Sequence, residues 1–310
     1  MFSALLIAAA ALTGAAEPAP TMDDALLALR QEDARVAAVA WRLTTANTEL
    51  CPDKGPQSGL LLQDALQYGP DVRPIAMHDF GLGGAPSVEA VAPGSPAEAA
   101  GLQPGDLLLS VNGARFYLVP PPEKAPASEE KLNAERRLLD AALSRGPAVI
   151  SYLRAGKAMT AKVDPVQGCA YRFELYPSPK REASSDGHTV TVTSALTRYA
   201  ERDEDLAVIL GHEMAHNVLQ HVQHPVGTSH SRERAADYVG AYLAARAGYD
   251  IGGAPDFWRR FGEDNWGASL GFLTHPTPTS RSRALAAAAA EIAAKKAAGQ
   301  PLLPASAPPR

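Results

Sequence analysis

A pair of histidines on one predicted helix constrains this chain more than any other feature. The segment DLAVILGHEMAH (205–216) carries apolar residues at helical spacing, and its first turn is acidic, as suits a helix N-terminus. His212 and His216 are four residues apart, so both lie on one side of the helix and can bind the same ion. Glu213 lies about 100° round the helix from the pair, close to such an ion but off the ligand axis. Zinc hydrolases use this arrangement; the alternative is a helix with two solvent-facing histidines and a glutamate.

A third metal ligand is predicted on the next helix, SRERAADYVGAYLAARAG (231–248). Glu233 can complete a site of two histidines and one glutamate, and Asp237 follows on the same face four residues later. The Asp237 carboxylate can accept the second N–H of a metal-bound histidine and so fix the tautomer of that ring. The competing zinc pattern HExxHxxGxxH is excluded, because it requires glycine and histidine where this chain has Leu219 and Val222.

Three motifs, GHEMAHN, ERAAD and HPTPTSR (275–281), resemble in order and spacing the HtpX-type and CAAX-prenyl-protease-like zinc metallopeptidases, which are gluzincins. The resemblance covers roughly residues 170–290. It implies one Zn²⁺ per chain, a general base at Glu213 and an orienting carboxylate at Asp237. The zinc ligands that it implies are His212, His216 and Glu233.

The resemblance also carries over His275 and Arg281 as catalytic residues, near the cleft, where an imidazole or guanidinium stabilises the oxyanion. The alternative for His275 is a histidine that caps a turn before Pro276. The same resemblance implies that an edge strand at Thr189–Thr193, beside the zinc helix, receives the substrate backbone.

Three further histidines follow the zinc motif. His221 is nine residues beyond His212, about 180° round a continuous helix, so it is predicted to face away from the metal. His224 and His230 lie in a polar break. Each is either a solvated loop histidine or a residue that occupies the open zinc position.

Residues 67–166 are predicted to form a separate domain. Within them, VEAVAPGSPAEAAGLQPGDLLLSVNGARF (88–116) resembles the PDZ domains of HtrA-type periplasmic proteases. GLGG (81–84) is predicted to be the hairpin turn before SVEAV, which places the peptide-accepting edge at 74–80. A Pro-rich insertion at 119–128 is predicted to be an exposed loop. The resemblance implies binding of C-terminal or extended peptides by strand addition; the alternative is a PDZ fold that serves only as a rigid spacer.

The start of the chain, 1–16, is interpreted as an export signal, because its apolar stretch is too short to span a bilayer and small residues follow it. No Lys or Arg precedes the apolar stretch, so either the signal is atypical or the true start lies upstream. An N-terminal helical segment is predicted at 17–66. Cys51 and Cys169 are the only cysteines, and in an exported protein a disulfide between them is expected; the alternative is two unrelated buried thiols.

The amino-acid composition and net charge limit the kinds of partner that this chain can bind. With 46% hydrophobic and 20% charged residues the chain is globular. The net charge of −5 is mild and the basic residues are scattered, which argues against nucleic acid or an anionic membrane surface. No other segment reaches transmembrane length without charge.

The zinc metallopeptidase domain is predicted at 167–298 and ends in a helix at 284–298, followed by a disordered tail at 299–310. Four aromatic residues between the Glu233 helix and His275 are expected to cover the zinc helices, the alternative being a loop that lines the substrate cleft: Trp258, Phe261, Trp266 and Phe272.

The sequence therefore predicts an α+β protein, in which a PDZ domain precedes a mainly helical gluzincin domain with a small edge sheet. The expected function is that of a zinc-dependent endopeptidase, periplasmic or secreted, that acts on polypeptides. A role on misfolded or unassembled envelope proteins is implied by the resemblance alone. Two alternatives are a PDZ-based peptide-binding or chaperone module with a structural or inactive zinc site, and a cytoplasmic protease with a misassigned N-terminus.

Overall fold

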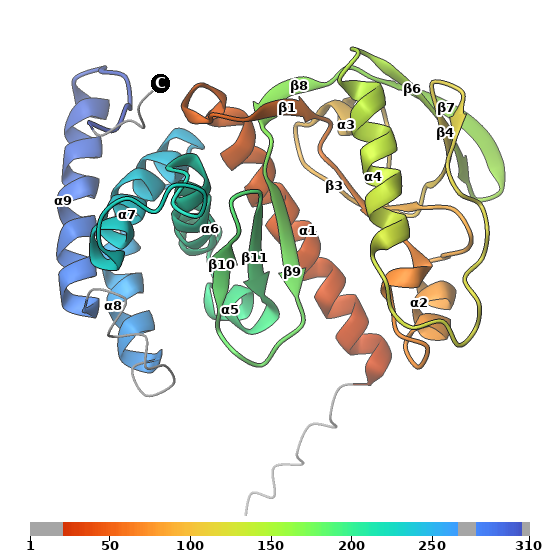
Figure 1. Cartoon of the computed structure of the whole chain (residues 1–310), viewed down its shortest axis with the longest axis horizontal. Coiled ribbons are helices and arrows are strands. Elements are labelled where there is room, and N and C mark those ends of the chain that lie inside the picture. The colour runs from red at the N-terminus through yellow and green to blue at the C-terminus, as the bar shows by residue number, and fades with distance from the viewer. Residues whose placement is uncertain (1–20, 266–276, 306–310) are drawn as a thin grey trace, which may run out of the picture.

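The computed structural model describes residues 21–265 and 277–305, and it has the predicted α+β fold (Figure 1). The predicted export signal at 1–16, Trp266, Phe272 and His275 lie outside the described residues. Each helix in residues 21–265 and 277–305 is either too short or too polar to span a bilayer.

The first part of the structure, called the sheet unit (60–163), is built on a six-stranded sheet. Five of its strands lie in the order β2-β3-β4-β6-β7, and the short strand β5 pairs with β4. Asn112 and Gly113 both have positive φ angles, 48° and 82°, and make the predicted hairpin turn between β4 and β5. The strands are β2 (Leu60–Gln63), β3 (Ser87–Val91), β4 (Leu107–Val111), β5 (Ala114–Arg115), β6 (Ala148–Arg154) and β7 (Lys157–Val163). The helices are η2 (Ala65–Gln67), α2 (Arg73–Asp79), α3 (Pro96–Ala99) and α4 (Glu130–Leu143).

The peptide-accepting strand expected at 74–80 is instead a helix, α2, so that prediction is wrong. Pro74 lies in the first turn of α2, where its missing N–H breaks no hydrogen bond, and Phe80 packs in a small cluster with Leu26. Gly81 follows α2 with a φ of 63°, which makes GLGG a helix terminus rather than a hairpin turn. The strand that pairs with β3 on the side away from β4 is β2, which begins before the domain boundary expected at residue 67.

The Pro-rich insertion at 119–128 is exposed along most of its length, as predicted. Arg73 of α2 is buried beneath it and donates hydrogen bonds to the backbone carbonyls of Pro122, Glu123 and Ala125. Because one member of each bond is charged, these bonds are stronger than neutral ones, and they give the insertion a fixed place against α2.

The second part, called the helical unit (172–265 and 277–305), has a three-stranded sheet of order β10-β11-β9, with α6 packed beside it and α7, α8 and α9 beyond α6 (Figure 1). Its core contains Leu206 and Met214 of α6, Tyr242 of α7 and Phe257 of α8. The strands are β9 (Arg172–Tyr176), β10 (Ala183–Ser185) and β11 (Thr189–Thr193). The helices are α5 (Ser194–Tyr199), α6 (Asp203–Val218), α7 (Ser229–Arg246), α8 (Ala254–Asn265) and α9 (Pro278–Ala297).

Strand β11 lies in the middle of its sheet, so the prediction of a substrate-accepting edge at Thr189–Thr193 is wrong. It pairs in parallel with β9 on one side and antiparallel with β10 on the other, which leaves no edge for a further strand. Among the described strands, the sheet edge next to α6 belongs to β10.

Helix α1 (Met22–Ala46) connects the two units. It begins at a capping box formed by Thr21 and Asp24, and it contacts β3 of the sheet unit as well as β9 and α6 of the helical unit. Figure 1 shows α1 running between the two units. Its buried residues Val36 and Leu43 belong to the core of the helical unit.

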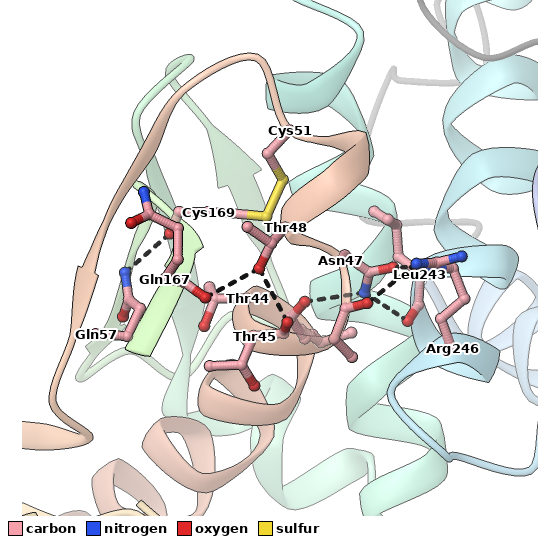
Figure 2. Close-up of a disulfide and its surroundings, with 12 residues drawn as sticks. Thr44, Thr45, Asn47, Thr48, Cys51, Gln57, Gln167, Cys169, Leu243 and Arg246 are labelled. Carbon is pink, nitrogen blue, oxygen red and sulfur yellow. Dashed lines mark hydrogen bonds between the residues drawn. A yellow bond between two sulfur atoms is a disulfide. The ribbon is translucent and has the colours of Figure 1, made fainter. Parts of the chain in front are cut away.

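Cys51 and Cys169 form the predicted disulfide, which joins the segment after α1 to strand β8 (Figure 2). Both cysteines are buried. Asn47, at the end of α1, donates a hydrogen bond of 2.9 Å to the carbonyl of Leu243 in α7. The C-terminal end of α1 is therefore hydrogen-bonded to the helical unit, and the disulfide ties the segment that follows it to β8, just before that unit begins. The adjoining elements are η1 (Thr48–Leu50), β1 (Lys54–Gln57) and β8 (Val166–Cys169).

The tail expected to be disordered from residue 299 is ordered over its described part, up to residue 305. Arg246 and Lys295 donate hydrogen bonds of 3.0 Å and 2.8 Å to the backbone carbonyls of Leu302 and Leu303, and Pro304 is buried. Composition suggested disorder, but cations on two neighbouring helices bind the carbonyls of this segment.

Candidate metal centre

Two glycines allow helices α6 and α7 to approach closely at the centre of the helical unit. A β-carbon at Gly240 would lie 2.8 Å from the backbone of His212, and one at Gly211 would lie 2.8 Å from the carbonyl oxygen of Gly240. Real β-carbons do not approach so closely, so only glycine fits at either position. The contact brings Glu233, at the start of α7, opposite the histidines near the end of α6.

The side chains of His212, His216 and Glu233 converge on one point. The two Nε2 atoms are 3.3 Å apart, and each lies 3.5 Å from an oxygen of Glu233. All three donor atoms lie within 4.8 Å of one another, as required of ligands that share one ion. Two imidazole nitrogens and a carboxylate are the donor set of a catalytic zinc site with an open position, so these residues fit Zn²⁺. The structure thus brings together the three ligands that the sequence singled out.

Asp237 lies behind His212. Its Oδ1 is 2.9 Å from His212 Nδ1, so the ring donates from Nδ1 and keeps Nε2 for the converging cluster. Burial alone would raise the pKa of Asp237, but the Arg281 guanidinium and the His212 ring outweigh burial and lower it to about 2. Asp237 is therefore ionised in the folded protein and fixes the orientation of His212.

Arg281 contacts the Asp237 carboxylate through two nitrogens of its guanidinium, and its expected role toward an oxyanion stays a prediction. Its Nη2 and Nε donate to the two carboxylate oxygens of Asp237 at 2.6 Å and 3.0 Å, and its guanidinium stacks 3.9 Å from the ring centre of Trp258. A guanidinium held in this fork has a positioning role, exerted on His212 through Asp237. The other residue carried over from the HPTPTSR motif, His275, lies outside the described residues.

Glu213 lies beside the cluster, in contact with the sheet edge. Ser185 of β10 lies near its carboxylate and acts to lower the pKa of Glu213. Burial raises the pKa of Glu213, and the attraction of His212 offsets this only in part. A carboxylate with a raised pKa is a better proton acceptor than an ordinary glutamate and suits a general base.

His212 and His216 have very different pKa values in the protein without a metal ion. Burial favours neutral imidazole in both, but hydrogen bonds to Asp237 and Glu233 outweigh it at His212 and raise the pKa of this ring to about 9. At His216, burial and repulsion from His212 lower the pKa to about 3. A metal ion therefore competes with a proton at His212 and binds His216 without such competition.

His221 contacts the metal cluster, contrary to the prediction that it faces away. Its Nδ1 lies 3.0 Å from Nδ1 of His216, so it accepts the second N–H of that ring when Nε2 faces the cluster. Helix α6 ends at Val218, and Gln220 adopts a left-handed φ of 54°, which turns the chain back. The sequence has no glycine at this turn, so helical spacing was wrongly extended through it. Residues 224 and 230 are both exposed, and neither joins the ligand cluster among the described residues.

Two family models match this chain. The model for peptidase family M48 matches residues 181–228, and the model for a PDZ domain matches residues 87–117. The M48 match includes His212, Glu213 and His216, whose geometry is that of a metallopeptidase site. This chain resembles the M48 peptidases.

The M48-like chain is also similar to a curated protein, the mitochondrial metalloendopeptidase OMA1 of Arabidopsis thaliana, with 27% identity over 132 residues. The alignment covers 32% of this chain and 27% of that protein, so the M48-like chain spans well under half of its relative's length.

Two solved structures resemble part of the M48-like chain. The HtrA3 PDZ domain bound to a phage-derived ligand is 20% identical, with a TM-score of 0.27, and the match covers 37% of this chain and 88% of that one. The HtrA-type protease AlgW with a decapeptide is 21% identical, with a TM-score of 0.25, and the match covers 37% of this chain and 30% of that one.

Proposed function

We propose that this chain is a zinc-dependent endopeptidase. The observation that carries the proposal is the convergence of His212, His216 and Glu233, with Glu213 beside them and Asp237 behind. Zinc held by the three ligands would act as a Lewis acid toward the scissile carbonyl and the attacking water. The chain's own side chains supply the remaining chemistry.

Glu213 is the proposed general base. It takes a proton from the attacking water and then delivers it to the leaving amine nitrogen. The raised pKa of this buried carboxylate supports both steps, because a group that binds protons more tightly is both a better acceptor and able to carry the proton to the amine. Asp237 and Arg281 keep His212 in the tautomer that presents Nε2 to the ion.

The proposed substrate is an extended polypeptide paired with β10. This strand ends its sheet among the described strands, it contacts α6, and its Ser185 lies near Glu213. A substrate added to β10 would therefore lie next to the general base, and main-chain pairing would accept many sequences.

The PDZ-like sheet unit is proposed to bind a polypeptide segment at β2, one of the two strands that end its sheet among the described strands. Export to a periplasm-like compartment is also proposed. Its support is the Cys51 to Cys169 disulfide, since such bonds persist in oxidising compartments. Misfolded or unassembled envelope proteins are the substrate class that follows from such a location.

The experiment is casein hydrolysis by the wild-type chain and by Glu213→Gln, each with and without a chelator. An endopeptidase loses hydrolysis both with the chelator and with Glu213→Gln, which keeps its zinc. A peptide-binding or chaperone module with a silent zinc site would show no cleavage in any sample while both proteins suppress aggregation of unfolded clients equally.

A further inference from the structure

A cavity of about 400 Å³ lies where the sheet unit, α1 and the helical unit meet. Its walls come from β1, from β2 and the two residues before it, from α4, from α1, and from β9 with the two residues that precede it. Its volume is within the range of sites that bind small ligands and short peptides. The cavity is separate from the metal centre, because none of the metal-cluster residues lines it.

Two strand edges face this cavity. Strand β2 ends the sheet of the sheet unit, and β9 ends the sheet of the helical unit, among the strands that the structure describes. The cavity is lined by residues 60–62 of β2 and residues 172–174 of β9. A strand at the end of a sheet presents backbone N–H and C=O groups that its own ladder does not use.

An extended polypeptide is the ligand that fits two such walls. Successive residues of an extended chain direct their N–H and C=O groups to opposite sides, so one peptide can pair with an edge on each side. The remaining lining includes Ala40 and Trp41 of α1 and Leu139 of α4, which are suited to apolar side chains. A compact polar ligand would leave these surfaces unused.

Two polar contacts cross the rim of the cavity from α4 to β9. Arg172 donates a hydrogen bond of 3.1 Å to Asn133, and Arg136 lies 3.7 Å from Glu174. Arg136 also contacts the carbonyl of Leu62 at 3.5 Å, on the edge of β2. Partly exposed contacts of this length are weak, so an entering peptide can displace them at small cost.

We propose that a peptide strand binds in this cavity between β2 and β9, so that the sheet unit and the helical unit form one shared peptide site. The inference rests on the proposed peptide binding by β2 and adds β9 as the second wall. Strand β9 is joined through β11 to β10, the strand proposed to receive the substrate. A peptide in the cavity would thus contact the same sheet that borders the metal centre.

The test uses a fluorescein-labelled hexapeptide of alternating threonine and valine, and two twins that are N-methylated at either the odd or the even residues. Each twin loses the N–H groups on one side only. Binding is measured by anisotropy to the full chain carrying Glu213→Gln, so that the probe is not cleaved. The shared site predicts that each twin binds at least about tenfold more weakly than the parent, since each loses two or three hydrogen bonds.

Leu61→Arg tests whether the peptide binds in the cavity, because Leu61 lines it, and this variant should abolish peptide binding. Val149→Arg, at an exposed position of the same sheet, is the control and should leave binding unchanged. If only one twin loses affinity, the peptide uses a single edge and the inference is overturned. Absence of parent binding, or binding that Leu61→Arg leaves intact, overturns it too. Casein hydrolysis by the wild-type chain reports separately on the proposed enzyme, so the two failures are distinguishable.

Discussion

Gly240 of α7 lies against the backbone of His212 in α6, and a β-carbon at Gly240 would come within 2.8 Å of it. This contact sets the distance between the helix that carries two proposed ligands and the helix that carries the third. The neighbour is backbone rather than the end of a flexible side chain, so it cannot move aside without shifting a helix.

Gly240→Ala is therefore expected to push α6 and α7 apart. We expect a loss of about 1–3 kcal/mol in the free energy of unfolding, and zinc affinity lower by about tenfold or more, because Glu233 moves away from the histidines. Thermal unfolding and competition with a chromophoric chelator measure the two effects. Gly69→Ala is the control, since a β-carbon there meets no atom within 4 Å. Unchanged zinc affinity in Gly240→Ala would show that the helix contact does not set the site.

His221→Ala is expected to lower zinc affinity by about 10- to 100-fold, because His216 loses the group that accepts its second N–H. Chelator competition measures this change, and His221→Gln should restore part of the affinity, since its amide oxygen can accept the same N–H. His224→Ala, an exposed histidine three residues on, is the matched control and should bind zinc as the wild type does. Equal affinities in the two alanine variants would contradict the assigned contact.

Arg281→Lys distinguishes a positioning role from direct stabilisation of an oxyanion. Lysine keeps the charge but cannot form the two-pronged contact with Asp237, so His212 is held less firmly. We expect zinc affinity to fall by about tenfold, together with hydrolysis. Arg283→Lys, an exposed position on the same helix, should change neither. Loss of kcat with undiminished zinc affinity would favour the oxyanion interpretation.

Two carboxylates at the contact between α1 and β3, the buried Glu89 and the half-buried Asp33, predict a pH dependence of stability. Burial raises the pKa of Glu89 to about 7, and burial together with repulsion from Glu89 raises that of Asp33 to about 8. Both folded-state pKa values lie above the unfolded ones, so the folded state binds protons more tightly between about pH 4 and pH 8, and stability falls as pH rises through that window. The other groups that act on this pair are Arg30, Glu32, Tyr68 and Arg136.

Glu89→Gln should remove part of this dependence, roughly 2–3 kcal/mol between pH 5 and pH 8. Urea unfolding at the two pH values measures it, and Glu123→Gln in the exposed insertion is the control. A Glu89→Gln protein that loses as much stability as the wild type between these pH values would rule out this source.

The metal cluster could be predicted because its geometry is local. His212 and His216 share one helix, and the spacing of Glu233 and Asp237 gives both carboxylates one face of the next. Within each helix, the periodicity of 3.6 residues per turn is enough to predict that the two side chains lie on the same face. The approach of the two helices at Gly211 and Gly240 is not local, because the glycines lie on different helices. No sequence pattern indicates that these two residues are in contact.

The wrong predictions concern features that sequence patterns do not show, namely contacts with residues distant in the chain and an unmarked turn. Thr189–Thr193 has the pattern of a strand, but only the pairing of β9 and β10 with it decides that it is central. The segment at 74–80 buries apolar residues either as a strand or as a helix, and contact with Leu26 of α1 favours the helix. His221 was misplaced because a left-handed turn at Gln220 has no glycine to mark it.

The central claim is that His212, His216 and Glu233 hold one zinc ion and that Glu213 does not. The most direct measurement is the zinc content of three purified proteins after dialysis against a weak chelator: the wild type, Glu213→Gln and Glu233→Ala. The account predicts one zinc per chain in the first two and little or none in the third. Zinc retained by Glu233→Ala at the wild-type level, or lost from Glu213→Gln, would contradict it.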